Sequence, residues 1–276
     1  MATIERDQQT IYFETEGDAS APPLLLISGI TDYVRKCDWQ RADLARDFYV
    51  VTFDNRGSGQ SSTPLPGFTT ADMAGDAVAV LDALDITAAH VFGFSLGGMI
   101  ALQMALAHPR RVRRLALGCT SAGGRLTVWP EARVVQAQAS PDGSGDRRRD
   151  FYNGVWLSVS DKTQTDDPEL IAQLADIAES NPQSPAGYAG QLRAVMSHDV
   201  ADRLGEIAAP TLVMHGADDR LIPPGNGRLL AERIPGAQLI LYPDAGHLFF
   251  IEKSAAVNRD LRAFLRAGLP VSRVTS

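Results

Sequence analysis

Gly93-Phe94-Ser95-Leu96-Gly97 decides the fold of this chain, together with the segments on either side of it. Residues 88–92 are short and apolar and predict a buried strand, whereas residues 98–107 are good helix formers and predict a helix. A serine between two glycines in a strand-to-helix turn is typical of a nucleophile elbow, where the turn is strained and neighbouring chain packs closely. The pattern predicts a nucleophilic Ser95 at the carboxyl edge of a sheet, with the Leu96 backbone N–H directed at a developing oxyanion.

Strands and helices alternate around this turn. Continuous apolar runs such as residues 24–27 are typical of parallel strands that are covered on both faces. The further predicted elements are strands at 10–15, 48–53, 114–118, 210–216 and 238–242, a helix over 71–84, and a C-terminal helix from about Ser254. This order predicts an α/β fold with a mostly parallel central sheet and helices on both faces.

The alternation is interrupted between residues 121 and 208, where no parallel-strand pattern appears. The periodicity there predicts amphipathic helices over 129–139, 147–158, 168–180 and 184–197. We therefore expect a core made of residues 1–120 and 209–276. A helical cap, residues 121–208, is inserted in it before the last strands.

Composition narrows the classes of partner. The chain has 276 residues, 45% of them hydrophobic and 21% charged, which is typical of a soluble globular protein, and its net charge of −7 argues against nucleic acid. The N-terminus lacks an apolar signal core and the longest apolar runs are too short to cross a bilayer, so we expect a cytoplasmic protein without a membrane partner. Histidines and carboxylates do not cluster at ligand spacing, so no metal and no cofactor are expected. The sequence carries no signal for the oligomeric state.

A serine nucleophile needs a base within hydrogen-bond reach, and the base needs an orienting acid. Of five histidines, His247 alone follows the last predicted strand in a glycine-containing loop, where sites of parallel sheets assemble. His215 ends a strand, and we expect it to pack under the following turn. Asp218 and Asp219 follow that strand, and the residues alone leave open which of them is the acid.

Four stretches carry a resemblance that spans almost the whole chain: residues 54–61, 93–98, 216–219 with Pro223, and 245–247. They resemble the α/β-hydrolase superfamily, in particular the capped branch of enol-lactonases, esterases and cofactor-free haloperoxidase-like proteins. The resemblance implies the chain order serine, aspartate, histidine. It assigns the acid to Asp219, three residues after Gly216.

The resemblance also implies the second oxyanion donor. This donor is the backbone N–H of Ile30 in the loop of residues 28–31, where Ser28 stands in place of the family's usual histidine. Phe94 and Leu248 flank the expected catalytic residues, and we predict that they line the substrate pocket.

The function that these observations predict is hydrolysis of a small-molecule carboxylic ester or lactone, through Ser95, His247 and Asp219 and an acyl-enzyme. A serine at the elbow argues against haloalkane dehalogenase and epoxide hydrolase chemistry, which uses an aspartate there. Hydrolysis of a thioester or a C–C bond on the same triad remains an alternative, and a perhydrolase side activity is compatible with the motif. A second alternative is a non-hydrolytic protein of this fold that binds or cyclises a ligand.

Overall fold

A computed structural model describes residues 2–63, 67–139, 146–180 and 183–267. It contains one sheet of eight strands in the order β1-β2-β4-β3-β5-β6-β7-β8. The strands are β1 (Ala2–Arg6), β2 (Gln9–Glu16), β3 (Pro23–Ile27), β4 (Tyr49–Phe53), β5 (Ala89–Phe94), β6 (Val112–Gly118), β7 (Thr211–Gly216) and β8 (Gln238–Tyr242). Strands β3 to β8 pair in parallel, whereas β2 is antiparallel to both β1 and β4. The prediction of a mostly parallel sheet is confirmed.

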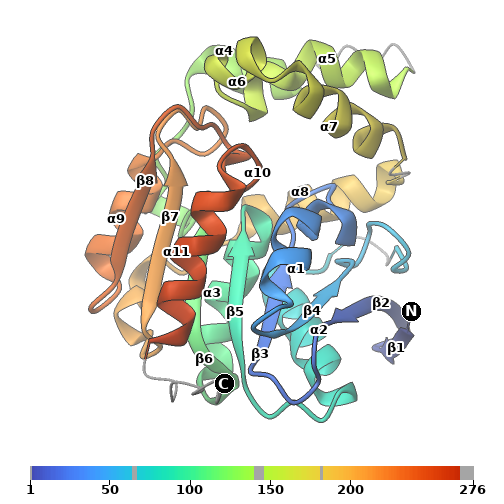
Figure 1. The fold of residues 1–276 in the computed structure, drawn as a ribbon, viewed down its shortest axis with the longest axis vertical. Coiled ribbons are helices and arrows are strands. Elements are labelled where there is room, and N and C mark those ends of the chain that lie inside the picture. Colours follow the sequence, from blue (N-terminus) through green and yellow to red (C-terminus); the bar gives the residue numbers. More distant parts are fainter. Residues whose placement is uncertain (1, 64–66, 140–145, 181–182, 268–276) are drawn as a thin grey trace, which may run out of the picture.

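Helices cover both faces of the sheet. They are α1 (Asp38–Leu44), α2 (Thr70–Ala83), α3 (Leu96–Ala107), α9 (Gly225–Arg233), α10 (Phe249–Glu252) and α11 (Ser254–Arg266). Figure 1 shows α1 and α11 in front of the sheet. Side chains of α1 and α11 share one buried core, and those of α2, α3 and α9 share the other.

The side chains of each apolar strand belong alternately to one core and to the other, because successive side chains of a strand point to opposite faces of the sheet. In β3, Leu24 and Leu26 belong to the core under α1 and α11, whereas Leu25 and Ile27 belong to the core under α2 and α3. A strand that is buried on both faces must be apolar at every position, which explains the uninterrupted run in the sequence.

A helical segment, residues 121–208, connects β6 to β7. Its helices are α4 (Ala132–Ala139), α5 (Arg147–Ser158), α6 (Asp161–Asp166), α7 (Pro168–Ser180) and α8 (Pro185–Ser197). Helices α4 to α7 lie beyond the carboxyl ends of the parallel strands (Figure 1). The only pairing of strand type in the described part of this segment is an isolated bridge between Gly123 and Asp199.

Several elements were not predicted. Strand β1 is mostly exposed and polar, so it has no apolar pattern. Helix α9 begins Gly225-Asn226-Gly227, and glycine is a poor helix former, so the sequence carries little helix signal there. The predicted helix over 129–139 begins only at Ala132, after Pro130. Within the described ranges, no helix is both long and apolar enough to span a lipid bilayer.

Candidate active site

Ser95 occupies a strained turn between β5 and α3. Its φ of 56° and ψ of −124° lie in a region that residues with a side chain rarely adopt. A Cβ atom on Gly93 would lie 2.2 Å from the Gly97 carbonyl oxygen, and one on Gly97 would lie 2.0 Å from the Ile27 carbonyl oxygen. The Ser95 N–H donates to the Gly118 carbonyl at 2.9 Å. The turn therefore depends on glycine at positions 93 and 97, as the motif predicted.

Asp219 and His247 form a buried pair. His247 Nδ1 lies 2.9 Å from Asp219 Oδ2, and the two residues are only 8% and 4% exposed. The other oxygen, Asp219 Oδ1, accepts the backbone N–H groups of Leu221 and Ile222, each at 2.9 Å. With Nδ1 as the donor to Asp219, His247 Nε2 is left to accept a proton. Ser95 Oγ makes no hydrogen bond to His247 in the structure, which is common before a substrate tightens the geometry.

His215 packs under the turn that follows β7, as expected, and contacts the acid Asp219 there. Its Nε2 lies 2.8 Å from the Ile222 carbonyl oxygen and 3.2 Å from Asp219 Oδ2. Burial alone would raise the pKa of Asp219, but the charge of His247 and the hydrogen bonds from His215 and His247 hold it at about 2. Burial lowers the pKa of His247, but the Asp219 charge and hydrogen bond outweigh that effect and leave it raised. The pair is therefore arranged to stabilise an imidazolium.

The two backbone N–H groups that were expected to bind an oxyanion are free in the described part of the chain. Neither Ile30 nor Leu96 donates its N–H to any described residue. The loop that carries Ile30 lies against the nucleophile, because a Cβ atom on Gly29 would lie 3.2 Å from Ser95 Cβ. Leu96 is the first residue of α3, where helix N–H groups lack intrahelical acceptors.

Three side chains hold the oxyanion loop, which we define as residues 28–34. The bonds are Asn55 Nδ2 to Ser28 O at 2.9 Å, Thr31 N to Gln191 Oε1 at 3.1 Å, and Val34 N to Asp54 Oδ1 at 2.8 Å. Gln191 belongs to α8 and is fully buried, and its Nε2 also donates to the Arg56 carbonyl at 2.9 Å. One amide thus ties the helical segment to two loops of the site. Nothing in the sequence distinguishes this glutamine from a surface residue.

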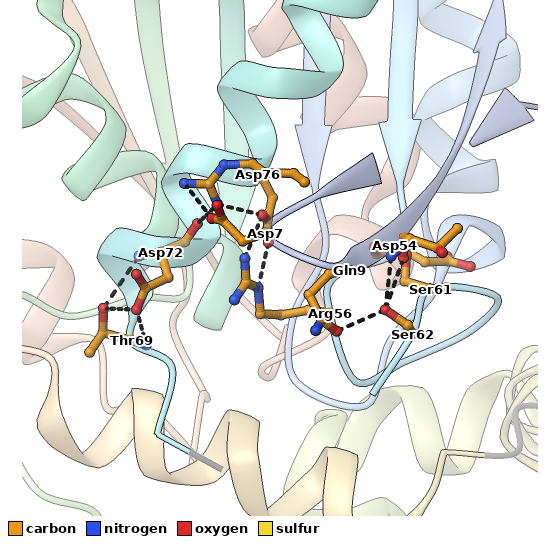
Figure 2. A network of polar contacts seen from close by, with 11 residues as sticks. Asp7, Gln9, Asp54, Arg56, Ser61, Ser62, Thr69, Asp72 and Asp76 are labelled. Atoms are coloured by element: carbon orange, nitrogen blue, oxygen red, sulfur yellow. Dashed lines mark hydrogen bonds and ion pairs between the residues drawn. The ribbon is translucent and has the colours of Figure 1, made fainter. Parts of the chain in front are cut away.

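The loop of residues 54–62, which supplies Asp54, Asn55 and Arg56 to these bonds, is itself held by hydrogen bonds at both ends (Figure 2). Arg56 donates from Nε and Nη2 to the two oxygens of Asp76 in α2, both at 2.6 Å. At the other end, Ser61 Oγ donates to the Asp54 carbonyl at 2.6 Å and Ser62 Oγ donates to Gln9 Oε1 at 2.9 Å. The loop that the resemblance singled out is thus a buried polar scaffold.

Glu252 of α10 makes a second link between the helical segment and the site. Its Oε1 accepts the Gly246 N–H at 2.7 Å, next to His247. Its Oε2 accepts the Ser160 N–H at 2.9 Å and the Thr163 hydroxyl at 2.6 Å. A single carboxylate therefore orients the histidine loop against α6. The sequence gives no sign of this contact, because an isolated glutamate after an apolar run resembles a surface residue.

The two predicted pocket residues, Phe94 and Leu248, are packed in the core that α1 and α11 cover. Phe94 is 1% exposed, and its ring stacks on Phe250 with 4.1 Å between centroids. Leu248 is 7% exposed and lies in the same core. Their role as pocket residues stays a prediction.

One described cluster has donor atoms close enough for a metal ion. It consists of Cys119, Asp219 and His247, with one atom of each within 4.8 Å of the others. Two of its members are already joined by the 2.9 Å hydrogen bond. Burial also raises the pKa of the Cys119 thiol well above its usual value, so the thiolate that a metal requires is disfavoured. This arrangement suits proton transfer better than metal binding.

Known proteins resemble the chain over most of its length. A poly(3-hydroxyalkanoate) depolymerase of Ectopseudomonas oleovorans is 35% identical over 269 residues, which cover 96% of this chain and 92% of that protein. Among solved structures, a hydrolase from Pseudomonas aeruginosa PA01 has a TM-score of 0.84 at 29% identity, with 96% of this chain and 97% of the other covered. The enol-lactonase from Burkholderia xenovorans LB400 has a TM-score of 0.83 at 26% identity, with 96% and 99% covered.

The family model for the α/β hydrolase fold matches residues 22–254. This range runs from the start of β3 to the start of α11 and includes Ser95, Asp219 and His247. The expected fold class and superfamily are therefore confirmed, and the chain belongs to the α/β-hydrolase fold family as a hydrolase.

Proposed function

We propose that this chain hydrolyses a carboxylic ester or lactone of a small molecule, with Ser95 as nucleophile, His247 as general base and Asp219 as the orienting acid. The observation that carries the proposal is the buried hydrogen bond from His247 to Asp219, at the same sheet edge as the strained Ser95 turn. An acid held ionised beside an imidazole, with the second imidazole nitrogen free, is what a serine nucleophile requires.

The proposed reaction runs in two halves. His247 Nε2 takes the Ser95 hydroxyl proton while Oγ attacks the carbonyl carbon. The oxyanion accepts the N–H groups of Ile30 and Leu96, and Asp219 stabilises the imidazolium. The alcohol leaves with the proton from His247, which breaks the ester bond and forms the acyl-enzyme. His247 then takes a proton from water while the water oxygen attacks the acyl carbon, and it returns that proton to Ser95 Oγ as the acyl–Oγ bond breaks and the acid is released.

Two of the similar proteins support an ester or lactone as the bond that is cleaved. The relative from E. oleovorans is named for a polymer whose units are joined by ester bonds, and the neighbour from B. xenovorans is named for an enol-lactone. Both linkages are acyl–oxygen bonds that one triad can break. We place the cleaved bond of this chain's substrate in that class.

The helical segment has the position of a cap, and we propose that residues 121–208 act as one. Gln191 joins the segment to the oxyanion loop, and Glu252 joins it to the histidine loop, so the segment is held against both loops of the candidate site. A cap that is bonded to the catalytic loops can close the site and exclude water from the acyl-enzyme.

Purified wild type should be assayed on a panel of nitrophenyl esters of increasing acyl length and on lactones of increasing ring size. Ser95→Ala and His247→Ala should each lower kcat by about four orders of magnitude, since removing a triad member leaves only binding and oxyanion stabilisation. Both variants should retain the wild-type circular dichroism spectrum. Near-normal turnover in either folded variant would refute the assignment. Turnover of thioesters or of C–C bonds in preference to every ester and lactone would move the reaction class to the alternative.

A further inference from the structure

Asp32 and Lys36 form a nearly buried pair of charges that the proposed reaction does not use. Asp32 lies in the oxyanion loop directly after Thr31, and Lys36 lies in the short 3-10 helix Val34–Cys37. The Asp32 side chain is 15% exposed and the Lys36 side chain 10%. Lysine is almost never buried to this extent without partners that satisfy its charge.

Both side chains lie beside the candidate catalytic residues. A Cβ atom on Gly29 would lie 2.9 Å from Asp32 Oδ2 and 3.2 Å from Ser95 Cβ, so a single methyl-sized volume separates that carboxylate from the nucleophile. The two charges also act on His247, whose pKa Asp32 raises and Lys36 lowers. The pair therefore lies close enough to Ser95 and His247 to act on the charges of the candidate site.

The Lys36 ammonium is incompletely satisfied there. Its distance to Asp32 Oδ1 is 3.7 Å, which makes an ion pair but is too long for a hydrogen bond. Among the residues that the structure describes, no acceptor lies within hydrogen-bond distance of Lys36 Nζ. A buried ion pair stabilises a fold only when close geometry and further hydrogen bonds offset its desolvation. Burial raises the pKa of Asp32 above its ordinary value even though Lys36 and the Gly29 N–H stabilise its carboxylate, so burying this pair is costly and stability explains it poorly.

We propose that Lys36 is an anion subsite of the candidate active site, which binds a carboxylate that the ester or lactone substrate carries in addition to its scissile bond. Asp32 is the counter-ion that holds the ammonium beside Ser95 until the substrate carboxylate takes its place. This inference rests on the proposed hydrolase function and names its substrate class: half-esters of dicarboxylic acids, or lactones with a carboxylate side chain.

The surrounding loop is built to hold this position. Thr31, directly before Asp32, donates its N–H to Gln191, and Val34 donates its N–H to Asp54 at 2.8 Å. The bonded positions bracket Asp32 and fix the start of the helical turn that carries Lys36. A fixed ammonium loses less side-chain freedom on binding an anion than one on the surface does.

The test compares two esters that differ only in charge. One is monoethyl succinate, and the other is the neutral ethyl ester with an isopropyl group in place of the carboxylate. The same pair is repeated with glutarate and adipate chains to cover the reach to Lys36. Turnover gives kcat/KM in the wild-type background. Isothermal titration calorimetry in a Ser95→Ala background gives the dissociation constants without turnover.

The variants are Lys36→Met, Asp32→Asn and the matched control Arg35→Met. Arg35 carries a cation in the same 3-10 helix and is also 3.7 Å from a carboxylate, but its side chain is 58% exposed. Lys36→Met should lower the preference for the anionic ester about 10- to 100-fold, the worth of a hydrogen bond to a charged group. Asp32→Asn should raise the preference severalfold, because the competing carboxylate is gone. Arg35→Met should leave it within about twofold.

The opposite signs exclude a purely structural role, since two damaged folds would both lose activity on both esters. Unchanged preference in Lys36→Met and Asp32→Asn, with the neutral ester still hydrolysed, would overturn this inference and leave the proposed function standing. If wild type hydrolyses no ester, but calorimetry still shows that Lys36 favours binding of the anionic ester, the proposed function is overturned instead. Equal binding of the two esters at every chain length, in the Ser95→Ala background with Lys36 intact, would also overturn the inference.

Discussion

Replacement of Asp219 by asparagine tests the assignment of the acid, because the structure shows how each carboxylate oxygen is used. Oδ1 accepts two backbone N–H groups and Oδ2 accepts from His247. An asparagine has one oxygen and one NH2 group. Its oxygen satisfies two backbone donors at the Oδ1 position. At the Oδ2 position His247 is the close donor, because His215 Nε2 lies 3.2 Å away and also contacts the Ile222 carbonyl oxygen at 2.8 Å. The amide is therefore expected to direct its NH2 group at His247.

This orientation reverses the histidine tautomer. His247 Nδ1 must then accept a hydrogen bond, so its proton moves to Nε2, where it blocks uptake of the Ser95 proton. The corresponding loss in a serine triad is about four orders of magnitude in kcat. That loss corresponds to about 5 kcal/mol of transition-state stabilisation. The fold should survive, since the substitution preserves the shape of the side chain and both backbone hydrogen bonds.

The assay is steady-state hydrolysis of nitrophenyl butyrate, with circular dichroism to verify folding. Asp218→Asn is the matched control, because Asp218 is the adjacent carboxylate, is exposed, and makes no side-chain hydrogen bond to any described residue. It should keep kcat within about twofold of wild type. An Asp219→Asn enzyme with a tenth or more of wild-type kcat, or a control that loses as much as Asp219→Asn, would refute this reading of the loop.

Three further predictions concern the base, the oxyanion loop and the turn. The kcat/KM should rise with pH through the raised pKa of His247, so the acid limb of its pH profile should lie above pH 6.5. Asp32→Asn should move this limb to lower pH, because it removes a negative charge that raises the pKa of His247. An acid limb at the same pH in both proteins would contradict this prediction. Gln191→Leu should lower kcat about 10- to 100-fold with a smaller change in KM, because it removes a bond that holds the oxyanion loop, whose N–H donors act in the transition state. Steady-state kinetics that show an effect on KM alone would contradict this prediction. Gly97→Ala should lower the free energy of unfolding by about 3 kcal/mol or more, since its Cβ atom would lie 2.0 Å from the carbonyl oxygen of Ile27 in β3. Gly154→Ala in α5, where the added Cβ atom meets open space, should instead raise the free energy of unfolding by about 0.5–1 kcal/mol. Thermal denaturation of the two variants and wild type measures both changes.

The sequence was sufficient where the determinants are local. The turn at Ser95 could be predicted because its glycines, the apolar strand before it and the helix formers after it are contiguous. Strands β3 to β7 could be predicted because they are mostly buried on both faces and therefore mostly apolar, whereas the edge strand β8 is only half-buried and could be predicted from its short apolar run. The helix at 147–158 has the predicted bounds, since the capping Asp146 marks its start.

Long-range polar contacts escaped prediction. Gln191 and Glu252 each bond to loops that are distant in the chain, and a single polar residue in a helix carries no mark of such a partner. The choice between Asp218 and Asp219 needed the family resemblance, since only the path of the loop decides which carboxylate turns inward. Lys36 was overlooked because its burial depends on how the oxyanion loop folds back on Ser95.

The central claim is that Ser95 is an activated nucleophile. The measurement that tests it most directly is the intact mass of the protein after exposure to a fluorophosphonate, with Ser95→Ala and His247→Ala treated alongside. We predict one adduct per wild-type chain, none on Ser95→Ala and a much slower reaction of His247→Ala. A folded wild type that gains no adduct, or a Ser95→Ala variant that is labelled as fast as wild type, would contradict the claim.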